Sequence, residues 1–404
     1  MRKFKKHNPI GKEELKSASK VIKSGILSDF VADESVNFYG GKNVRKFENF
    51  AKKYFKTKYA ISVNSWTSGL TCAVGALDIY PGDEVIVTPF TMAASVTSII
   101  HWNAIPIFCD IEEETFNLDP NKVEKKITSK TKAIMLVDIC GHPIDIDKFK
   151  KIAKKYNLKL IVDSAQSIGA KYLKTGKYSG TVGDVGGFSF NCHKHINTGE
   201  GGLLVTNSSE IARKLYLIRN HGEQVIKSKQ LKKLYNIIGY NLRMGEIEAA
   251  IAIEQLKKLK KIIKKKQNQA KKIINGVKML EGLYPPKINK NVTHSFYNMG
   301  FKISDDINRN KVIKLLKKEG VPCNPGYLNI HRLPMFKKKI AYGKNNFPWS
   351  LNKKKYNFQK CEIAEKMHNK NYFGVGMCSF DFTEKDIDYI ISKFHKVWSK
   401  IKKK

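Results

Sequence analysis

Seven short apolar runs rich in β-branched residues alternate with helical patterns in this chain, and the alternation constrains the fold more than any other feature. The runs span residues 59–64, 84–89, 105–110, 133–139, 158–165, 185–190 and 201–207. Helical patterns lie among them at 67–77, 93–102 and 146–157. Strands that alternate with helices pair mostly in parallel and are covered on both faces. The sequence therefore predicts an α/β fold with a mostly parallel, seven-stranded sheet.

The character of the chain changes after about residue 250. A long basic helix comes first, and helical patterns at 308–320 and 383–401 follow an irregular stretch. No Gly- or Ser-rich linker separates the two parts, and 404 residues are more than a single core usually holds. We predict a large α/β domain over residues 1–250 and a smaller α+β domain over residues 251–404.

Composition excludes several classes of protein. No run approaches the roughly 18 apolar residues of a membrane span, and the basic first residues lead into no apolar segment. The seven cysteines are scattered singly without a CxxC pair, which argues against a disulfide framework and a zinc ribbon. We therefore expect a cytoplasmic protein without a secretory signal, a membrane partner or a bound metal.

The formal net charge of +38 is of the kind found in proteins that bind nucleic acid, because Lys and Arg bind phosphate backbones. Lysines are nevertheless spread along the whole chain, and the densest run, residues 255–273, places Leu256, Leu259 and Ile263 at helical spacing with lysines between them. This spacing is typical of an amphipathic helix with a solvated face. We expect no specific nucleic-acid partner, although an anionic substrate would benefit from the charge, and nucleic-acid binding stays as a minor alternative.

Polar residues follow two of the predicted strands where those strands end. In "VNSWTSGL" (63–70), Thr67 and Ser68 open a helix, where backbone N–H groups and hydroxyls can surround an anion, although Ser or Thr at this place can also simply cap the helix. In "IVDSAQSIGA", Asp163 and Gln166 lie at the edge where open α/β sheets bind ligands. The alternative for Asp163 is a cap on the following turn.

Lys194 lies between two histidines in "GGFSFNCHKHINTGEGG" (186–202), and three roles are open to it. A metal or acid/base site would use His193 and His195, but these point in opposite directions on an extended segment, and no second ligand cluster accompanies them. A solvated lysine leaves the apolar strand and the glycine-rich turn unexplained. The third role, a buried amine that forms a Schiff base, accounts for both flanks.

One ligand would use all of these features together. Pyridoxal phosphate carries a cationic ring nitrogen that needs a carboxylate, a phosphate that suits a helix N-terminus and an aldehyde that a lysine can hold. Asp163, the helix after the first strand and Lys194 lie at the same edge of the predicted sheet. The sequence therefore predicts pyridoxal 5'-phosphate as the cofactor.

Six motifs carry a resemblance to a known family, in its order and with its spacings: "VNSWTSGL", "GDEVIVTPFTMAAS", "PIFCDIEEETFNLDP", "VDSAQSIGAKY", "FSFNCHKHINTGEGG" and "IGYNLRMGEIEAA". The chain resembles the DegT/StrS-type nucleotide-sugar aminotransferases, pyridoxal-phosphate enzymes of fold type I, over nearly its whole length. The resemblance implies that Lys194 holds the cofactor and shuttles the proton, that Asp163 pairs with the pyridine nitrogen and that Gln166 lies against the ring or its 3-hydroxyl.

The resemblance also implies the remaining site residues. The phosphate would be held by Thr67, Ser68 and Ser189. Asn241 would reach the phosphate of the neighbouring subunit's cofactor in a homodimer with shared sites, and Arg243 would meet the carboxylate of the amino donor or the diphosphate of the sugar. Where most members place an aromatic ring over the pyridine, this chain has Met92, whose thioether can cover a ring face.

The resemblance implies an aminotransferase that moves an amino group from glutamate to a keto-sugar carried by a nucleotide diphosphate, in the biosynthesis of surface polysaccharide or lipopolysaccharide. A keto-cyclitol acceptor stays open. Some members are deoxysugar dehydratases in which a histidine replaces the lysine. In this chain the flanking motifs "FSF" and "TGEGG" fix the alignment of the residues between them, and Lys194, not His193 or His195, then occupies the position of the family's lysine. A non-catalytic regulator is disfavoured because the catalytic set is complete.

Overall fold

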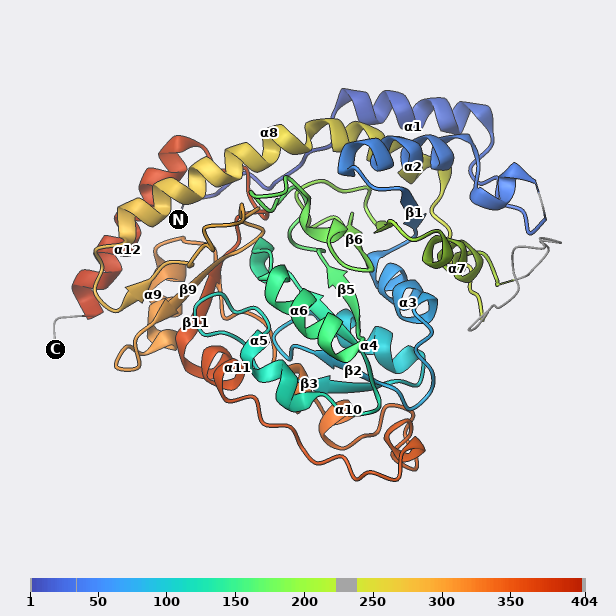
Figure 1. The fold of residues 1–404 in the computed structure, drawn as a ribbon. Coiled ribbons are helices and arrows are strands. Elements are labelled where there is room, and N and C mark those ends of the chain that lie inside the picture. The colour runs from blue at the N-terminus through green and yellow to red at the C-terminus, as the bar shows by residue number, and fades with distance from the viewer. Residues whose placement is uncertain (1, 34, 223–237, 402–404) are drawn as a thin grey trace.

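The computed structural model describes residues 2–33, 35–222 and 238–401, and its main body is a seven-stranded sheet with helices packed around it (Figure 1). The strands are β1 (Tyr59–Val63), β2 (Glu84–Val87), β3 (Ile105–Phe108), β4 (Thr131–Val137), β5 (Lys159–Asp163), β6 (Val185–Ser189) and β7 (Gly202–Thr206). Each strand overlaps one of the seven apolar runs, so the predicted α/β sheet is confirmed.

The strand order is β1-β7-β6-β5-β4-β2-β3. Neighbours from β3 to β6 pair in parallel, whereas β7 is antiparallel to both β6 and β1. The chain therefore leaves β6 at its carboxyl end and returns directly into β7 from the same edge. This reversal keeps the segment between them, residues 190–201, at the carboxyl edge of the sheet, where open α/β sheets bind ligands.

Helices cover both faces of this sheet because its buried residues alternate between two apolar clusters. Phe188 and Leu203 belong to a cluster with residues of α2 and α8, whereas Ile61 and Leu204 belong to a second cluster with residues of α3 and α4. The helices of eight or more residues are α1 (Lys12–Ser24), α2 (Lys42–Phe55), α3 (Trp66–Ala76), α4 (Ala93–His101), α6 (Ile146–Tyr156), α7 (Ser209–Arg219), α8 (Glu246–Val277), α9 (Arg309–Lys318) and α12 (Glu384–Ile401). No helix in the described ranges is long and apolar enough to cross a membrane.

A second sheet, of order β10-β11-β9-β8, lies toward the C-terminal end of the chain. Its strands β8 (Leu283–Tyr284), β9 (Met299–Ile303), β10 (Cys323–Asn324) and β11 (Tyr372–Val375) share an apolar cluster with α9, α12 and the last turns of α8. The short helices α5 (Pro120–Val123), α10 (Pro334–Lys337) and α11 (Glu362–Lys366) lie outside that sheet. The division at residue 250 stays a prediction, and α8 runs through that position without a break.

The N-terminal arm, residues 2–9, lies against the C-terminal part of the chain. His7 N donates to Ser379 O over 3.0 Å, Asp381 N donates to Lys5 O over 2.9 Å, and Phe4 packs edge-on against Phe380 and Phe382. The arm then passes to α1, which lies along α8 (Figure 1). The first and last parts of the chain are therefore joined across the same side of the molecule.

A buried ion pair joins α2, β1 and α7. The Arg219 guanidinium is fully buried, and its Nη1 lies 2.5 Å from Glu48 Oε1 and 3.1 Å from Ser62 O. Glu48 Oε1 also accepts hydrogen bonds from Ser62 N and Ser62 Oγ, at 2.8 and 2.9 Å. Because both charged groups are removed from water, the cost of their desolvation is offset only by their mutual attraction and by these additional hydrogen bonds.

Candidate active site

A pocket of about 320 Å³ opens at the carboxyl edge of the main sheet. Val137, Asp163 and Ser189 enter it from the last positions of β4, β5 and β6. Residues 65–67, at the start of α3, and residues 91–92, in the connection after β2, also line it. Lys194 lines the same pocket from the β6–β7 connection. The parallel strands therefore bring the predicted amine, carboxylate and helix N-terminus together at one place.

Asp163 is buried and accepts three hydrogen bonds. Trp66 Nε1 and Ala165 N donate to Oδ1 over 2.7 and 3.1 Å, and the Ser95 hydroxyl donates to Oδ2 over 2.8 Å. Sequence reasoning missed Trp66 and Ser95, although both lie in the motifs "VNSWTSGL" and "FTMAAS". These donors fix the carboxylate at the end of β5, where only 4% of Asp163 is exposed.

Lys194 reaches the pocket with a largely desolvated amine. Burial lowers the pKa of this amine from its ordinary value, and the carboxylate of Asp163 opposes the shift. The Nζ atom lies 4.4 Å from the centroid of the Tyr297 ring, which contributes the face of its π-system to the same pocket. A lowered pKa raises the fraction of neutral amine, and the neutral form is the one that attacks a carbonyl.

The segment around Lys194 is a turn, so the expectation of an extended segment is wrong. Lys194 N donates to Asn191 O over 2.9 Å, and Asn191 Nδ2 donates to Glu200 Oε1 over 2.7 Å, which closes the connection onto itself. His193 is exposed and lines the pocket, whereas His195 is fully buried and its Nε2 lies 2.9 Å from Ser295 O. Burial lowers the pKa of His195 to about 3.

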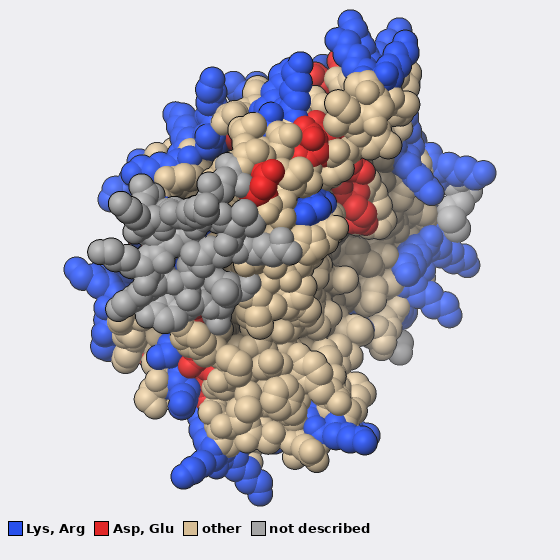
Figure 2. Space-filling view, turned by 90° about the vertical axis from the view of Figure 1, so that its right-hand side faces the viewer, with Lys and Arg blue, Asp and Glu red and all other residues tan. Residues whose placement is uncertain are grey.

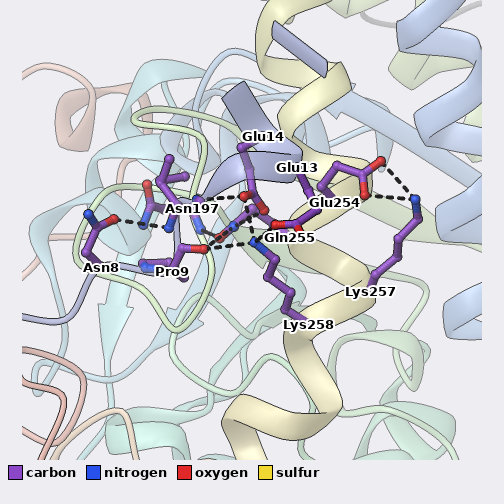
Figure 3. Close-up of polar contacts among 11 residues, drawn as sticks. Asn8, Pro9, Glu13, Glu14, Asn197, Glu254, Gln255, Lys257 and Lys258 are labelled. Atoms are coloured by element: carbon purple, nitrogen blue, oxygen red, sulfur yellow. Dashed lines mark hydrogen bonds and ion pairs between the residues drawn. The ribbon is translucent and has the colours of Figure 1, made fainter. Parts of the chain in front are cut away.

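Hydrogen bonds from outside hold this turn. His7 Nε2 lies 2.9 Å from the carbonyl oxygen of His195, and Gln255 Oε1 accepts from Asn197 N over 3.0 Å. Gln255 Nε2 donates to Pro9 O over 3.0 Å and to the buried Glu14 over 2.7 Å (Figure 3). The N-terminal arm and α8 therefore act as a brace behind the lysine-bearing turn.

Gln166 is buried and held from two sides. Its Oε1 accepts from Cys140 N over 2.8 Å, and its Nε2 donates to the Tyr327 hydroxyl over 2.6 Å. Tyr327 belongs to the segment 326–334, and it brings the C-terminal part of the chain into the pocket beside Tyr297. Sequence reasoning assigned neither tyrosine to the site, because neither lies in one of the six motifs.

The first turn of α3 offers the predicted anion site. Thr67 and Ser189 line the pocket together with Ser65, the N-cap residue of α3. Ser68 lies in the same turn but outside the pocket lining: its backbone N–H donates to Ser65 Oγ and its hydroxyl donates to Asn64 Oδ1. Helix N-termini favour phosphate because N–H groups and the helix dipole point at the bound anion.

Three further predicted residues lie at or beyond the rim. Met92 lines the pocket and is 62% exposed, so its thioether is available to a ligand. Asn241 is exposed and Arg243 donates to Asn220 Oδ1 over 2.9 Å, and neither residue lines the pocket. In the part of the chain that the structure describes, no group of three His, Cys, Asp or Glu residues could hold a metal ion.

The donor set fits pyridoxal phosphate, because an amine, a buried carboxylate and a hydroxyl-rich helix N-terminus meet in one pocket. Among the solved structures that share the fold are an aminotransferase and a dehydratase. The aminotransferase from Psychrobacter cryohalolentis is 27% identical with a TM-score of 0.84, and 99% of this chain covers 100% of it. A GDP-4-keto-6-deoxymannose-3-dehydratase with a trapped PLP-glutamate geminal diamine is 26% identical with a TM-score of 0.80, and 96% of this chain covers 99% of it. Fold and site define a pyridoxal-phosphate-dependent aminotransferase of fold type I.

Sequence comparison gives the family. Residues 26–359 match the model of the DegT/DnrJ/EryC1/StrS aminotransferase family. The GDP-perosamine synthase of Escherichia coli O157:H7 is 33% identical over 363 residues, which are 89% of this chain and 91% of that protein. The chain belongs to the DegT/DnrJ/EryC1/StrS aminotransferase family, so the resemblance found in the sequence is confirmed.

Proposed function

We propose that this enzyme moves an amino group from glutamate to a keto-sugar carried by a nucleotide diphosphate, in the biosynthesis of surface polysaccharide. The observation that carries the proposal is the meeting of Lys194, Asp163 and the N-terminus of α3 in one pocket. The similarity to a GDP-perosamine synthase supports a nucleotide-sugar substrate. An excess of Lys and Arg over Asp and Glu would favour a substrate that carries phosphates.

Each site residue has a role that follows from its position. The cofactor, when bound, withdraws electrons from the carbon that gains or loses the amino group. Asp163 would hold a proton on the ring nitrogen, because a fixed carboxylate in a desolvated site stabilises a cation beside it. Thr67, Ser189 and the first turn of α3 would hold the phosphate, and Ser68 would support that turn.

Lys194 would have two tasks at the same atom. Its neutral Nζ would hold the cofactor at the aldehyde carbon, with loss of water, and the same amine, when free, would carry the proton that moves at the reacting carbon. The Tyr297 ring, 4.4 Å from Nζ, offers the free ammonium a place inside the pocket. Gln166, fixed between Cys140 and Tyr327, would orient the ring or its 3-hydroxyl.

A cytoplasmic homodimer with shared sites belongs to the same proposal. Asn241 is exposed and outside its own pocket, as expected of a residue that serves a partner's cofactor, and Arg243 lies beside it for a substrate's anionic group. Ile22, Ile26, Leu27 and Val36 are more than half exposed, in and after α1. Figure 2 shows the right-hand side of the molecule in Figure 1, where Lys and Arg lie mostly around the rim and much of the surface that is not grey is neither acidic nor basic. Such a face suits a second copy of the chain.

The test starts from enzyme loaded with pyridoxal phosphate. It should be yellow, glutamate should bleach it, and nucleotide keto-sugars should restore the colour when added to the resulting pyridoxamine form. The panel should include keto-cyclitols, which would identify the alternative acceptor. Lys194→Ala is the matched control and should lose turnover entirely; turnover equal to that of the parent would refute the assignment of Lys194.

The same panel separates the dehydratase alternative. A dehydratase would remove a hydroxyl group from the sugar without leaving nitrogen on it, whereas the proposed enzyme would yield an amino sugar. Mass spectrometry of the product distinguishes these two outcomes. A deoxysugar without added nitrogen would replace the proposed reaction, while the assignment of the cofactor would stand.

A further inference from the structure

Trp66 makes a hydrogen bond to Asp163 that its local sequence does not predict. It is the first residue of α3, only 4% exposed, and its indole N–H donates to Asp163 Oδ1 over 2.7 Å across 97 positions of sequence. The ring also lines the active-site pocket. A buried indole usually finds an acceptor, but here the acceptor is the carboxylate assigned to the cofactor.

The donors around Asp163 are unequally shared between its two oxygens. Oδ1 accepts from both Trp66 Nε1 and Ala165 N, whereas Oδ2 accepts from the Ser95 hydroxyl. The Ser95 oxygen in turn lies 2.9 Å from the Thr91 hydroxyl. A carboxylate oxygen accepts about two hydrogen bonds, so Oδ1 is filled and Oδ2 retains an acceptor position.

The backbone leaves little freedom for the indole. A Cβ atom placed on Gly69 would lie 2.6 Å from Trp66 Cε3, and one on Gly187 would lie 2.4 Å from Trp66 Cζ3 and 2.0 Å from Leu203 O. The ring therefore packs closely against Gly69 of α3 and Gly187 of β6, with its N–H directed at Asp163 of β5. Close packing of this kind makes the direction of the hydrogen bond a fixed property of the fold.

We propose that Trp66 is a positioning residue that occupies Asp163 Oδ1 and so presents Oδ2 to the ring nitrogen of pyridoxal phosphate. The inference rests on the proposed role of Asp163. Without the indole N–H, the carboxylate keeps one donor on each oxygen and can rotate, so its two oxygens compete for the ring N–H. Trp66 therefore acts on the cofactor through Asp163.

The test compares Trp66→Phe with a matched variant. Trp102→Phe is the control, because the Trp102 indole is also buried, donates a 2.7 Å hydrogen bond, to Thr71 O, and lies over a glycine, Gly75. Thr71 O belongs to a neutral peptide group away from the pocket. Both variants lose a buried indole donor, and only one of them changes the surroundings of Asp163.

Two readouts report on the bound cofactor. Titration of apoprotein with pyridoxal phosphate should show affinity about 5- to 50-fold weaker for Trp66→Phe, the range expected when a hydrogen bond to a charged group is partly lost. The ¹⁵N NMR signal of cofactor labelled at the ring nitrogen, which reports the proton on that atom, should change at lower pH than in the parent, since the paired carboxylate holds that proton less well. Trp102→Phe should match the parent in both readouts, even if its melting temperature falls as much as that of Trp66→Phe.

The possible results are distinguishable. If Trp66→Phe binds the cofactor and titrates like the parent while Asp163→Asn loses both properties, the proposed role of Trp66 is wrong and that of Asp163 stands. If Asp163→Asn also behaves like the parent, the proposed function of Asp163 fails. If Trp66→Phe does not fold, 3-benzothienylalanine at position 66 keeps the two-ring shape, replaces N–H by sulfur and must give the same weakened binding.

Discussion

The buried pair of Glu48 and Arg219 allows a prediction that does not depend on the catalytic assignment. Glu48→Gln keeps the size of the side chain but leaves the Arg219 guanidinium, which is 0% exposed, without its counter-charge. Removing one partner of a buried ion pair costs about 3–5 kcal/mol, because the remaining charge stays desolvated. The neighbours Ser62 O and Tyr39 O accept from the guanidinium but carry no compensating charge.

The expected change in melting temperature follows from the length of the chain. At about 2.1 cal/mol/K per residue, cooperative unfolding of 404 residues has an entropy near 0.85 kcal/mol/K, so this loss corresponds to a decrease of about 4–6 °C. Differential scanning calorimetry of the apoprotein, at equal subunit concentration, measures it. Lys257→Met is the control, because the Lys257–Glu254 pair lies on the surface and should contribute less than 1 °C.

A double variant sharpens this test. Glu48→Gln combined with Arg219→Met removes both charges, so it should recover part of the lost stability relative to Glu48→Gln alone. A single variant that melts within 1 °C of the parent would show that the pair is solvated or replaceable. A double variant whose decrease equals the sum of the two single decreases would refute the coupling between the charges.

Three further predictions follow from the structure. Burial raises the pKa of Asp138 to about 6, although hydrogen bonds from Ser164 and Ser167 oppose the shift. The free energy of unfolding of the parent, relative to that of Asp138→Asn, should therefore be greatest below pH 4 and fall by about 3 kcal/mol as the pH rises through 6. A difference between the two proteins that stays constant with pH in calorimetry would contradict this. Heterodimers of Asn241→Ala and Lys194→Ala should contain one site with neither defect, so activity at limiting cofactor should exceed that of either parent variant; no gain on mixing would place Asn241 on its own subunit's cofactor. Nucleic acid should be retained only weakly and released by salt, and submicromolar affinity at physiological ionic strength would overturn this expectation.

Periodicity was sufficient to predict the elements that lie at the centre of the sheet. Buried strands consist of apolar residues because both faces are covered, and the end of β5 therefore revealed Asp163. Ser189, at the end of β6, was expected only from the family resemblance. The helices at 67–77, 93–102 and 146–157 agree with α3, α4 and α6 to within one residue at each end. In these cases the local pattern and the tertiary environment impose the same structure.

Contacts between distant residues could not be predicted in this way. Trp66 reads locally as an apolar residue in the first turn of a helix, and nothing near it in the sequence indicates a bond to Asp163. The turn at Lys194 depends on the Asn191 side chain, which donates to Glu200 and accepts from His193 N, and these hydrogen bonds compete with the extended backbone that was expected there. Tyr297 and Tyr327 reach the pocket only because the C-terminal part packs against the large sheet.

The N-terminal arm has a consequence for the order in which the protein is completed during synthesis. His7 meets Asp381 across 374 positions, and closing a loop of that length in an unfolded chain costs about 5 kcal/mol. The arm is synthesised long before the backbone that it pairs with, residues 379–381. Until then the contact from His7 to the lysine-bearing turn lacks the support of the C-terminal partner. A nascent chain can therefore form its large sheet, whose last strand ends at Thr206, while the brace behind Lys194 is complete only after residues 379–381 have been made.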